Sequence, residues 1–560
     1  MEHQSRKILM AALFAVFIFL RLFSDSSSVV VGGDYIKCLL MAKNFPYHTT
    51  ANNQMEINHG PFFPYLVYSF TMIFQEDYMA AIIISLLSAV ITFYIIYRLS
   101  MMLTNNFFIT FIVLIFFTLS VEFITTSQIG TKESFVLMII ISSIYFYIKG
   151  IKFRDKQSII AASIFGGITA LTVDHTIFLF PTFFFAYIFF NYKKIDLKRL
   201  VFPGLKYAAL PVLVTLVFYA SWTGLKAYQY STNEYYPAGA DGDPVSTEGF
   251  GIMELLNPRY FEGYDPTLTA KYTPRIRDYA YGLGYMFDIV PFDIPRGINF
   301  SNFDRLLHPR HVAYMLLLYA PLALMALFFV LWILKNFARN RKIYNNAPLF
   351  IILIFLIFLF PLTQTKSSLR YFYTSFIFLY FFLGYGILLV YNKLDLGKKL
   401  SRFSGNLIIV ITILLLLLIP YWYISHGNLI LLNGKYVTTP KTAEFIRSNI
   451  NPDLGIMVQT GYNYQLQYQI GSRIVGIPPN RETLLRMIDY YDIDFILFGN
   501  FISGYYHYSE DSINYIKNNP EKFTLLATIS EEENQELRVH ADEISIFKVL
   551  KPEEKAKKDH

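Results

Sequence analysis

The stretch Gly32-Gly33-Asp34-Tyr35 directly follows the first long apolar segment, and Asn58-His59-Gly60-Pro61-Phe62-Phe63-Pro64-Tyr65 comes after it. The run from Pro61 to Phe74 is apolar but too short for a membrane span, which needs about 20 residues. We therefore expect this run to lie along a membrane surface or to dip into the membrane and out again. Asp34 is then a carboxylate at the mouth of a span, where water, lipid headgroups and lipid-borne molecules meet.

The composition predicts a membrane protein with many spans. The chain has 560 residues, of which 54% are hydrophobic and 16% are charged, and it contains many long uncharged runs. A single water-soluble globule does not have this composition. Cys38 is the only cysteine, so the chain has no internal disulfide and no thiolate metal site. Nothing in the sequence indicates nucleic-acid binding.

About eleven segments meet the length criterion for transmembrane helices. Arg6 and Lys7 precede the first one, and no clean small-x-small cleavage site follows, so we interpret it as an uncleaved span. The segments are Ile8–Phe23, Met79–Arg98, Phe107–Phe123, Ser134–Ile148, Ser158–Val173, Thr176–Phe190, Val201–Leu225, Val312–Leu334, Ala347–Leu362, Leu369–Tyr391 and Leu407–Ser425.

The basic residues predict the orientation of these spans. They concentrate in alternate connections, and short basic loops favour the cytoplasmic side. We expect a multi-pass protein of the cell (inner) membrane with a cytoplasmic N-terminus and an extracytoplasmic or periplasmic C-terminal segment. The basic residues of the predicted inner loops are Arg98, Lys149, Lys152, Arg154, Lys156, Lys193, Lys194, Lys198, Arg199, Lys335, Arg339, Arg341, Lys342, Lys393, Lys398, Lys399 and Arg402.

Two domains follow from this topology. Residues 1–425 form the transmembrane domain, with large outer loops at 24–78 and 226–311, and residues 426–560 form a soluble domain outside the membrane. Strands that alternate with helices in the second domain predict an α/β layer. The helices are Pro440–Asn449, Arg481–Tyr491 and Glu510–Asn518, and the strands are Gly455–Thr460, Arg473–Ile477, Asp494–Gly499, Phe523–Ile529 and Glu543–Val549.

Three groups of charged residues stand out as candidates for chemistry. Asp34 fits a helix N-cap before Tyr35–Phe45, a role compatible with catalysis because capping fixes the side chain. Lys132 and Glu133 begin the fourth span, where Glu133 also suits the helix dipole. Lys366 and Arg370 lie at the start of a late span. Arginine binds phosphate through two hydrogen bonds, and the alternative for Arg370 is snorkelling to lipid headgroups.

Other candidates have simpler explanations. Asp174-His175 occupies a turn between two spans, and His59 and the stretch His308-Pro309-Arg310-His311 carry little weight. The spacing of Asp241-Gly242-Asp243 is one that binds a divalent metal, but turn chemistry explains it. Asp492-Ile493-Asp494 falls at a helix–strand junction, which favours a structural role.

Taken together, these features resemble the GT-C-fold glycosyltransferases. The nearest branch is the protein O-mannosyltransferase and aminoarabinose-transferase type, glycosyltransferase family 39. The resemblance rests on Asp34 after the first span, the run from His59 to Tyr65, Lys132-Glu133, and Arg370-Tyr371-Phe372-Tyr373. The C-terminal α/β domain resembles the soluble domain of bacterial members. One departure is His59-Gly60-Pro61, where the family often has His-Pro-Pro.

The resemblance implies a sugar donor on a polyprenyl phosphate and a lipid, glycan or protein acceptor. Asp34 and Glu133 would be catalytic, with Asp34 as the base, and Lys132, Lys366 and Arg370 would bind the donor phosphate. Possible substrate-binding residues are Tyr35, His59, Asp174, His175 and Tyr371. A carboxylate deprotonates the acceptor hydroxyl and cations stabilise the leaving lipid phosphate, so we expect no metal or other cofactor.

Alternative functions predict other features. A transporter or flippase of lipid-linked glycans would carry ionisable groups near mid-membrane and repeats with broken helices, whereas the charges here cluster at span ends. A receptor or assembly platform needs no carboxylate at the membrane mouth. An O-antigen ligase or polymerase shares the compartment but uses a diphosphate donor.

Overall fold

The computed structural model describes residues 2–22, 33–43, 60–128, 130–173, 178–191, 209–222, 329–335, 347–359, 373–393, 440–451, 454–458, 474–478, 481–490, 492–499, 510–531 and 542–551, with a few isolated positions. The chain divides into two compact units. One contains most of the helices, and the other contains α2 (Gly33–Lys43), α3 (Phe62–Phe74) and the C-terminal domain. The predicted division between residues 425 and 426 stays a prediction.

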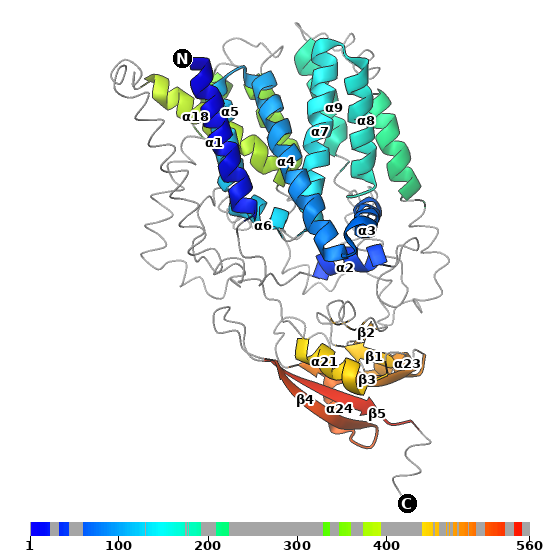
Figure 1. Ribbon diagram of the computed structural model, residues 1–560. Helices are drawn as coiled ribbons and strands as arrows, with labels where there is room; N and C mark the ends of the chain where they lie inside the picture. Colours follow the sequence, from blue (N-terminus) through cyan, green and yellow to red (C-terminus); the bar gives the residue numbers. More distant parts are fainter. Residues whose placement is uncertain are drawn as a thin grey trace, which may run out of the picture. The chain divides into compact units, whose positions relative to one another are not determined.

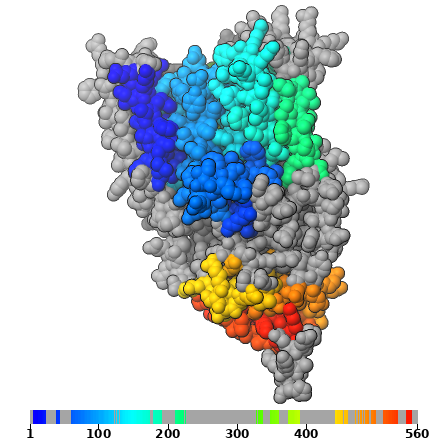
Figure 2. Space-filling model, turned by 45° about the vertical axis from the view of Figure 1, so that its right-hand side comes forward, coloured from blue at the N-terminus to red at the C-terminus, as the bar shows by residue number. Residues whose placement is uncertain are grey.

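The first unit is a bundle of helices that run side by side (Figure 1). In Figure 2, the helices from blue α1 onward follow one another across one face. The elements are α1 (Glu2–Leu22), α4 (Asp77–Thr104), α5 (Phe107–Leu119), α6 (Val121–Gln128), α7 (Lys132–Phe153), α8 (Lys156–Ala170), α9 (Leu179–Asn191), α17 (Ala347–Leu359) and α18 (Tyr373–Lys393), with a further apolar helix at Ala209–Trp222.

Aromatic side chains fill the contacts between these helices. The ring of Phe17 on α1 lies 4.8 Å from that of Phe93 on α4 and 5.9 Å from that of Phe117 on α5. Phe116 of α5 stacks on Tyr380 of α18 at 5.4 Å. Much of the phenylalanine in the sequence therefore packs helix against helix in the interior, in addition to any that faces lipid.

Helix α4 has opposite faces of opposite character. Its buried face carries small polar residues such as Ser88 and Thr92, whose hydroxyls donate to carbonyls one turn back in the same helix. Its exposed face carries the large apolar residues Leu87, Ile91 and Tyr94. Small residues at helix contacts and large apolar residues outside are typical of helices packed in lipid.

The helices agree with the predicted spans where the structure describes them. Among the described residues, Asp77–Thr104 and Lys132–Phe153 are long and apolar enough to cross a membrane, and several shorter apolar helices accompany them. The count of eleven spans stays a prediction, because the segment Leu407–Ser425 and parts of others lie outside the described residues.

The predicted third span, Phe107–Phe123, is wrong at its C-terminal end. Helix α5 ends at Leu119, Ser120 is extended with ψ of 119°, and α6 begins at Val121. Ser120 and Glu122 are polar residues at this break, but the segment has no glycine or proline, so the length and hydropathy of the segment did not locate the break. Contacts from α1, described below, stabilise the broken conformation.

Several basic residues of the described helices gather at one end of the bundle. The Arg6 guanidinium lies 5.4 Å from the Phe107 ring centre, and Lys152 Nζ donates to the carbonyl of Met102. Lys149 lies 3.6 Å from Asp155, whose pKa is lowered chiefly by the hydrogen bond from Ser158. The start of α1, the end of α4 and the α7–α8 turn therefore share this end.

The second unit includes the short helices α2 and α3, which pack together. Helix α2 begins at Gly33, so Asp34 lies in its first turn and not at the predicted N-cap. The five consecutive residues from Cys38 to Ala42 are all buried, so this part of the helix has no exposed face. Helix α3 buries Phe63 and Val67 and exposes Met72 and Ile73.

The C-terminal domain confirms the predicted α/β pattern, and its elements begin and end within a few residues of the predicted positions. A five-stranded sheet has the order β2-β1-β3-β5-β4, in which β1 is parallel to β2 and β3, and β5 is antiparallel to β3 and β4. The elements are α21 (Pro440–Asn449), β1 (Gly455–Val458), β2 (Ile474–Gly476), α23 (Arg481–Tyr490), β3 (Ile493–Gly499), α24 (Glu510–Asn518), β4 (Phe523–Glu531) and β5 (Asp542–Val549).

Separate hydrophobic clusters cover the two faces of this sheet. Alternate residues of β3 divide between them: Ile496 packs with the helices α23 and α24, and Leu497 packs with α21. The strand is therefore apolar on both faces, as expected for the central strand of a mixed sheet that helices cover on both sides.

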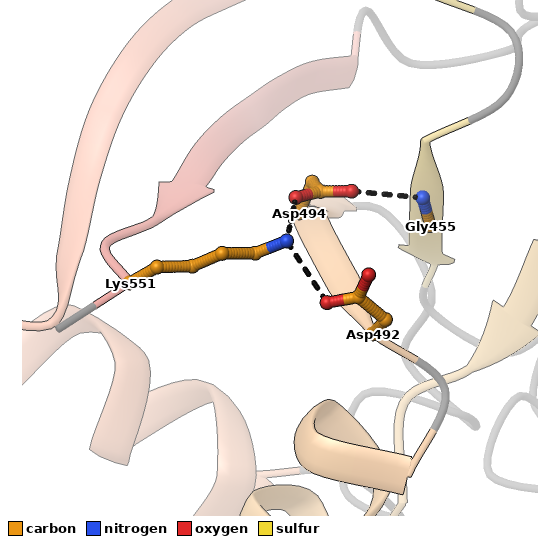
Figure 3. Close-up of polar contacts among 4 residues, drawn as sticks. All are labelled: Gly455, Asp492, Asp494 and Lys551. Carbon is orange, nitrogen blue, oxygen red and sulfur yellow. Dashed lines mark hydrogen bonds and ion pairs between the residues drawn. The ribbon is translucent and has the colours of Figure 1, made fainter. Parts of the chain in front are cut away.

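Asp492-Ile493-Asp494 has the structural role that its position predicted. Lys551 Nζ lies 2.9 Å from Asp492 Oδ1 and 2.8 Å from Asp494 Oδ1, and the other oxygen of Asp494 accepts from the Gly455 amide (Figure 3). The hydrogen bond to Asp494, followed by that to Asp492, raises the pKa of Lys551. The cluster joins the end of β5 to the starts of β3 and β1.

Gly455 gives a test of this junction. A methyl group at Gly455 would collide with the main-chain oxygen of Asp492, which cannot move without breaking the β1–β3 pairing. We expect Gly455→Ala to destabilise the domain by about 1–3 kcal/mol, which lowers hydrogen-exchange protection of β1 and β3 roughly 10- to 100-fold. Gly224→Ala is the control, because its methyl group meets nothing within 4 Å; equal protection in the two variants would contradict the prediction.

Candidate functional site

The first turn of α7 carries Lys132 and Glu133, both half-buried. Thr131 precedes them as the extended N-cap residue, with ψ of 154°. The Glu133 carboxylate makes no hydrogen bond or ion pair with the described residues, and it lies where the helix dipole stabilises negative charge. The turn thus presents a cation and a carboxylate side by side at a helix N-terminus.

Two contacts fix the position of Thr131. Ser85 Oγ of α4 donates to the Thr131 carbonyl at 2.8 Å, and Thr131 Oγ1 donates to the Thr126 carbonyl of α6 at 3.1 Å. One residue earlier, Gly130 is buried and has φ of 70°, a left-handed conformation that glycine adopts without strain. The turn before Lys132 therefore has a defined shape that is held from α4 and α6.

Arg21 at the end of α1 is a buried cation that the sequence analysis did not single out. Its side chain is buried, and its guanidinium carbon lies 3.8 Å from the Phe17 ring centre. Its nitrogens donate to the carbonyls of Phe117 and Thr118, at 3.4 and 3.5 Å, where α5 ends. The signal was an ionisable residue inside an otherwise apolar predicted span, Ile8–Phe23, which marks a functional position.

This contact explains why α5 breaks at Ser120. The last carbonyls of a helix have no partner within the helix, and a cation stabilises them. The Arg21 side chain supplies donors and charge together, so α5 can end in an apolar environment and α6 can begin in a new direction. Helix α6 then leads directly to the turn that carries Lys132.

The structure places the other predicted residues as follows. Asp34 and Tyr35 lie in the first turn of α2, in the second unit. Near them in sequence, Lys43 at the end of α2 lies 3.8 Å from Asp77 at the start of α4. The remaining candidates, His59, Asp174, His175, Lys366, Arg370 and Tyr371, lie outside the described residues.

The described residues contain no group of three or more His, Cys, Asp or Glu side chains placed to hold a metal. The Lys132–Glu133 turn can bind an anion through the ammonium group and accept a proton or hydrogen bond through the carboxylate. Both functions need the two side chains to stay in place relative to the substrate. The buried contacts that fix the turn provide this.

The comparisons with known proteins agree with this architecture. A sequence model of the family described as dolichyl-phosphate-mannose-protein mannosyltransferase matches residues 58–222, which include α3 to α9 and the Lys132–Glu133 turn. The undecaprenyl-phosphate complex of ArnT from Cupriavidus metallidurans aligns with a TM-score of 0.52 over 96% of this chain and 97% of that chain, at 11% identity. The chain has the GT-C fold.

Two further structures share this GT-C fold. ArnT from the same organism in the apo state aligns with a TM-score of 0.51 over 96% of this chain and 97% of that chain, at 11% identity. The archaeal oligosaccharyltransferase AglB from Archaeoglobus fulgidus, in complex with an inhibitory peptide and a dolichol-phosphate, aligns with a TM-score of 0.53 and 15% identity over 89% of this chain and 69% of that chain. No curated protein matches the sequence. The predicted fold class, a polytopic membrane protein of GT-C type, is confirmed.

Ser85 tests how the turn is held. Replacing Ser85 with alanine removes the interhelical hydrogen bond to Thr131, whose net contribution is about 0.5–1.5 kcal/mol. We expect hydrogen exchange of residues 131–135 to accelerate roughly 2- to 10-fold. Ser88→Ala is the matched control, because this buried serine of the same helix donates only to Ile84 in its own helix. Equal acceleration in both variants would show that Ser85 does not hold the turn.

Proposed function

We propose that this protein is a membrane glycosyltransferase that moves a sugar from a polyprenyl-phosphate donor to a lipid, glycan or protein acceptor. The main support for this proposal is the alignment of nearly the whole chain with the undecaprenyl-phosphate complex of ArnT, together with the family match over residues 58–222. Both relationships concern proteins whose substrates are linked to a lipid phosphate. The transporter or flippase alternative has no support in these comparisons.

The residues divide between two tasks in this proposal. Asp34 is the base that deprotonates the acceptor hydroxyl, and Glu133 assists as a second carboxylate. Lys132, together with Lys366 and Arg370, binds the donor phosphate and stabilises the negative charge that develops as the lipid phosphate leaves. The position of Lys132 at a helix N-terminus supports this role, because the helix dipole and the ammonium group both attract an anion.

The charge distribution supports the proposed orientation in the membrane. The described basic residues around Arg6, Lys152 and Lys149 share the end of the bundle where α1 begins. We assign this end to the cytoplasm of a cell with an inner membrane, since basic connections stay on that side. The Lys132–Glu133 turn, near the end of α1, then belongs to the extracytoplasmic side, where the proposed reaction takes place.

Asp34 provides the direct test of the proposal. Loss of a general base lowers the rate roughly 100-fold or more, so we expect Asp34→Asn to stop release of sugar from a radiolabelled polyprenyl-phosphate sugar in lipid with crude envelope as acceptor. Asp77→Asn is the acidic control from the same unit and should keep turnover within about threefold, because Asp77 has no proposed catalytic role. Equal turnover in wild type and Asp34→Asn would remove Asp34 from the mechanism.

Removal of divalent metal tests the cofactor proposal. Cationic side chains can stabilise a leaving monophosphate without a metal, so we expect the turnover of the wild-type protein to be unchanged by EDTA. The measurement compares initial rates with EDTA, with EDTA and excess magnesium, and without either. A rate that falls with EDTA and returns with magnesium would show that the reaction needs a divalent metal.

A further inference from the structure

The last turn of α1 holds both ends of the segment that links α5 to α7. Arg21 donates to the carbonyls of Phe117 and Thr118 at the start of this segment. At its end, Gln128 Nε2 donates to the carbonyl of Leu20 at 2.7 Å. Because residues 20 and 21 are consecutive, one turn of α1 contacts both the last turn of α5, just before α6, and the last residue of α6.

The position of α6 is transmitted to the Lys132–Glu133 turn. Gln128 is the last residue of α6, and Lys132 begins α7 four positions later. Thr126 of α6 accepts from Thr131 Oγ1 through its carbonyl, and its hydroxyl lies 3.4 Å from that of Ser134 in the first turn of α7. A shift of α6 relative to α1 would therefore move Lys132.

Stability alone does not account for an amide at position 128. The Gln128 side chain is 3% exposed, and its Oε1 finds no hydrogen-bond partner among the described residues. A buried amide oxygen without a partner lowers stability, whereas an apolar side chain of the same volume would not. What the amide supplies is one directed bond to α1, which fixes where α6 ends.

We propose that Gln128 and Arg21 are positioning residues that place Lys132 for binding the lipid phosphate of the donor. This inference rests on the proposed function, in which Lys132 contacts that phosphate. Neither positioning residue needs to touch the substrate. Their effect passes through α6 and the turn at 130–131, so it should disappear when Lys132 itself is absent.

The test measures binding of undecaprenyl phosphate to the purified full-length protein in lipid. We expect Lys132→Gln to weaken binding about tenfold and Gln128→Met, which keeps the side-chain volume but loses the donor, to weaken it about fivefold. The double variant should bind no more weakly than Lys132→Gln alone. The affinity of Arg21→Lys for undecaprenyl phosphate should lie between those of wild type and Arg21→Met, because lysine keeps the positive charge but not the several hydrogen-bond donors of the guanidinium.

Ser143→Ala is the matched control. Ser143 lies in the middle of α7 and donates to the Ala162 carbonyl of α8 at 2.8 Å, so it makes the same kind of buried interhelical bond away from the turn. We expect its binding of undecaprenyl phosphate to stay within twofold of wild type. The thermal midpoint of each variant, measured beside binding, separates displacement of the turn from unfolding of the bundle.

The possible outcomes distinguish failure of the positioning role from failure of the proposed function on which it rests. If Lys132→Gln weakens binding but Gln128→Met does not, or if their effects add in the double variant, the positioning role is wrong and the phosphate site stands. If Ser143→Ala weakens binding as much as Gln128→Met, the effect is general loss of packing and the inference is overturned. If wild type does not bind, or Lys132→Gln binds like wild type, the proposed role of Lys132 fails and the inference fails with it.

Discussion

The guanidinium of Arg21 is the interaction on which the described part of the bundle depends. A buried arginine is tolerated only where its donors and charge are used, and here the carbonyls at the end of α5 and the ring of Phe17 use them. The contact lets a helix end in an apolar interior. Without that end, α5 would continue along its axis and α6 could not approach the start of α7.

The helical bundle and the C-terminal domain follow different rules of packing. The bundle packs small hydroxyl-bearing residues and aromatic rings against each other, and its outer faces keep large apolar side chains. The C-terminal domain has the arrangement of a water-soluble layer, in which apolar side chains lie between sheet and helices and a lysine with two aspartates joins strand ends at the surface. The surface of the bundle therefore suits lipid, and that of the C-terminal domain suits water.

The sequence was a good guide wherever the local pattern decides the structure. Pro440 at the first turn of α21 and the apolar run of β3 set those elements almost to the residue, because capping, turn chemistry and burial all act locally there. The predicted span Ser134–Ile148 likewise located α7, which begins at Lys132 and ends at Phe153. For Asp34 the pattern located the helix but placed its start two residues late.

Features that depend on contacts between residues far apart in the chain could not be predicted from the local sequence pattern. The break at Ser120 has no glycine or proline to mark it, and Ser120 and Glu122 alone do not end a helix. Arg21, almost a hundred positions earlier, stabilises the break. The sequence analysis did not single out Gln128, and its bond to Leu20 appears only when α1 and α6 are side by side. The predicted group of phosphate-binding residues stays a prediction for the same reason, since it joins residues from separate helices.

The two-faced character of α4 has a practical consequence. The buried hydroxyls of Ser88 and Thr92 donate hydrogen bonds to carbonyls of their own helix. The packing of helices in the interior therefore does not depend on contacts with lipid. Leu87, Ile91 and Tyr94 make the outside compatible with a bilayer and contribute little to which helix neighbours which. Exchanging such outward residues for glutamine, lysine or glutamate is thus a rational route to a detergent-free version of the bundle that keeps its internal arrangement.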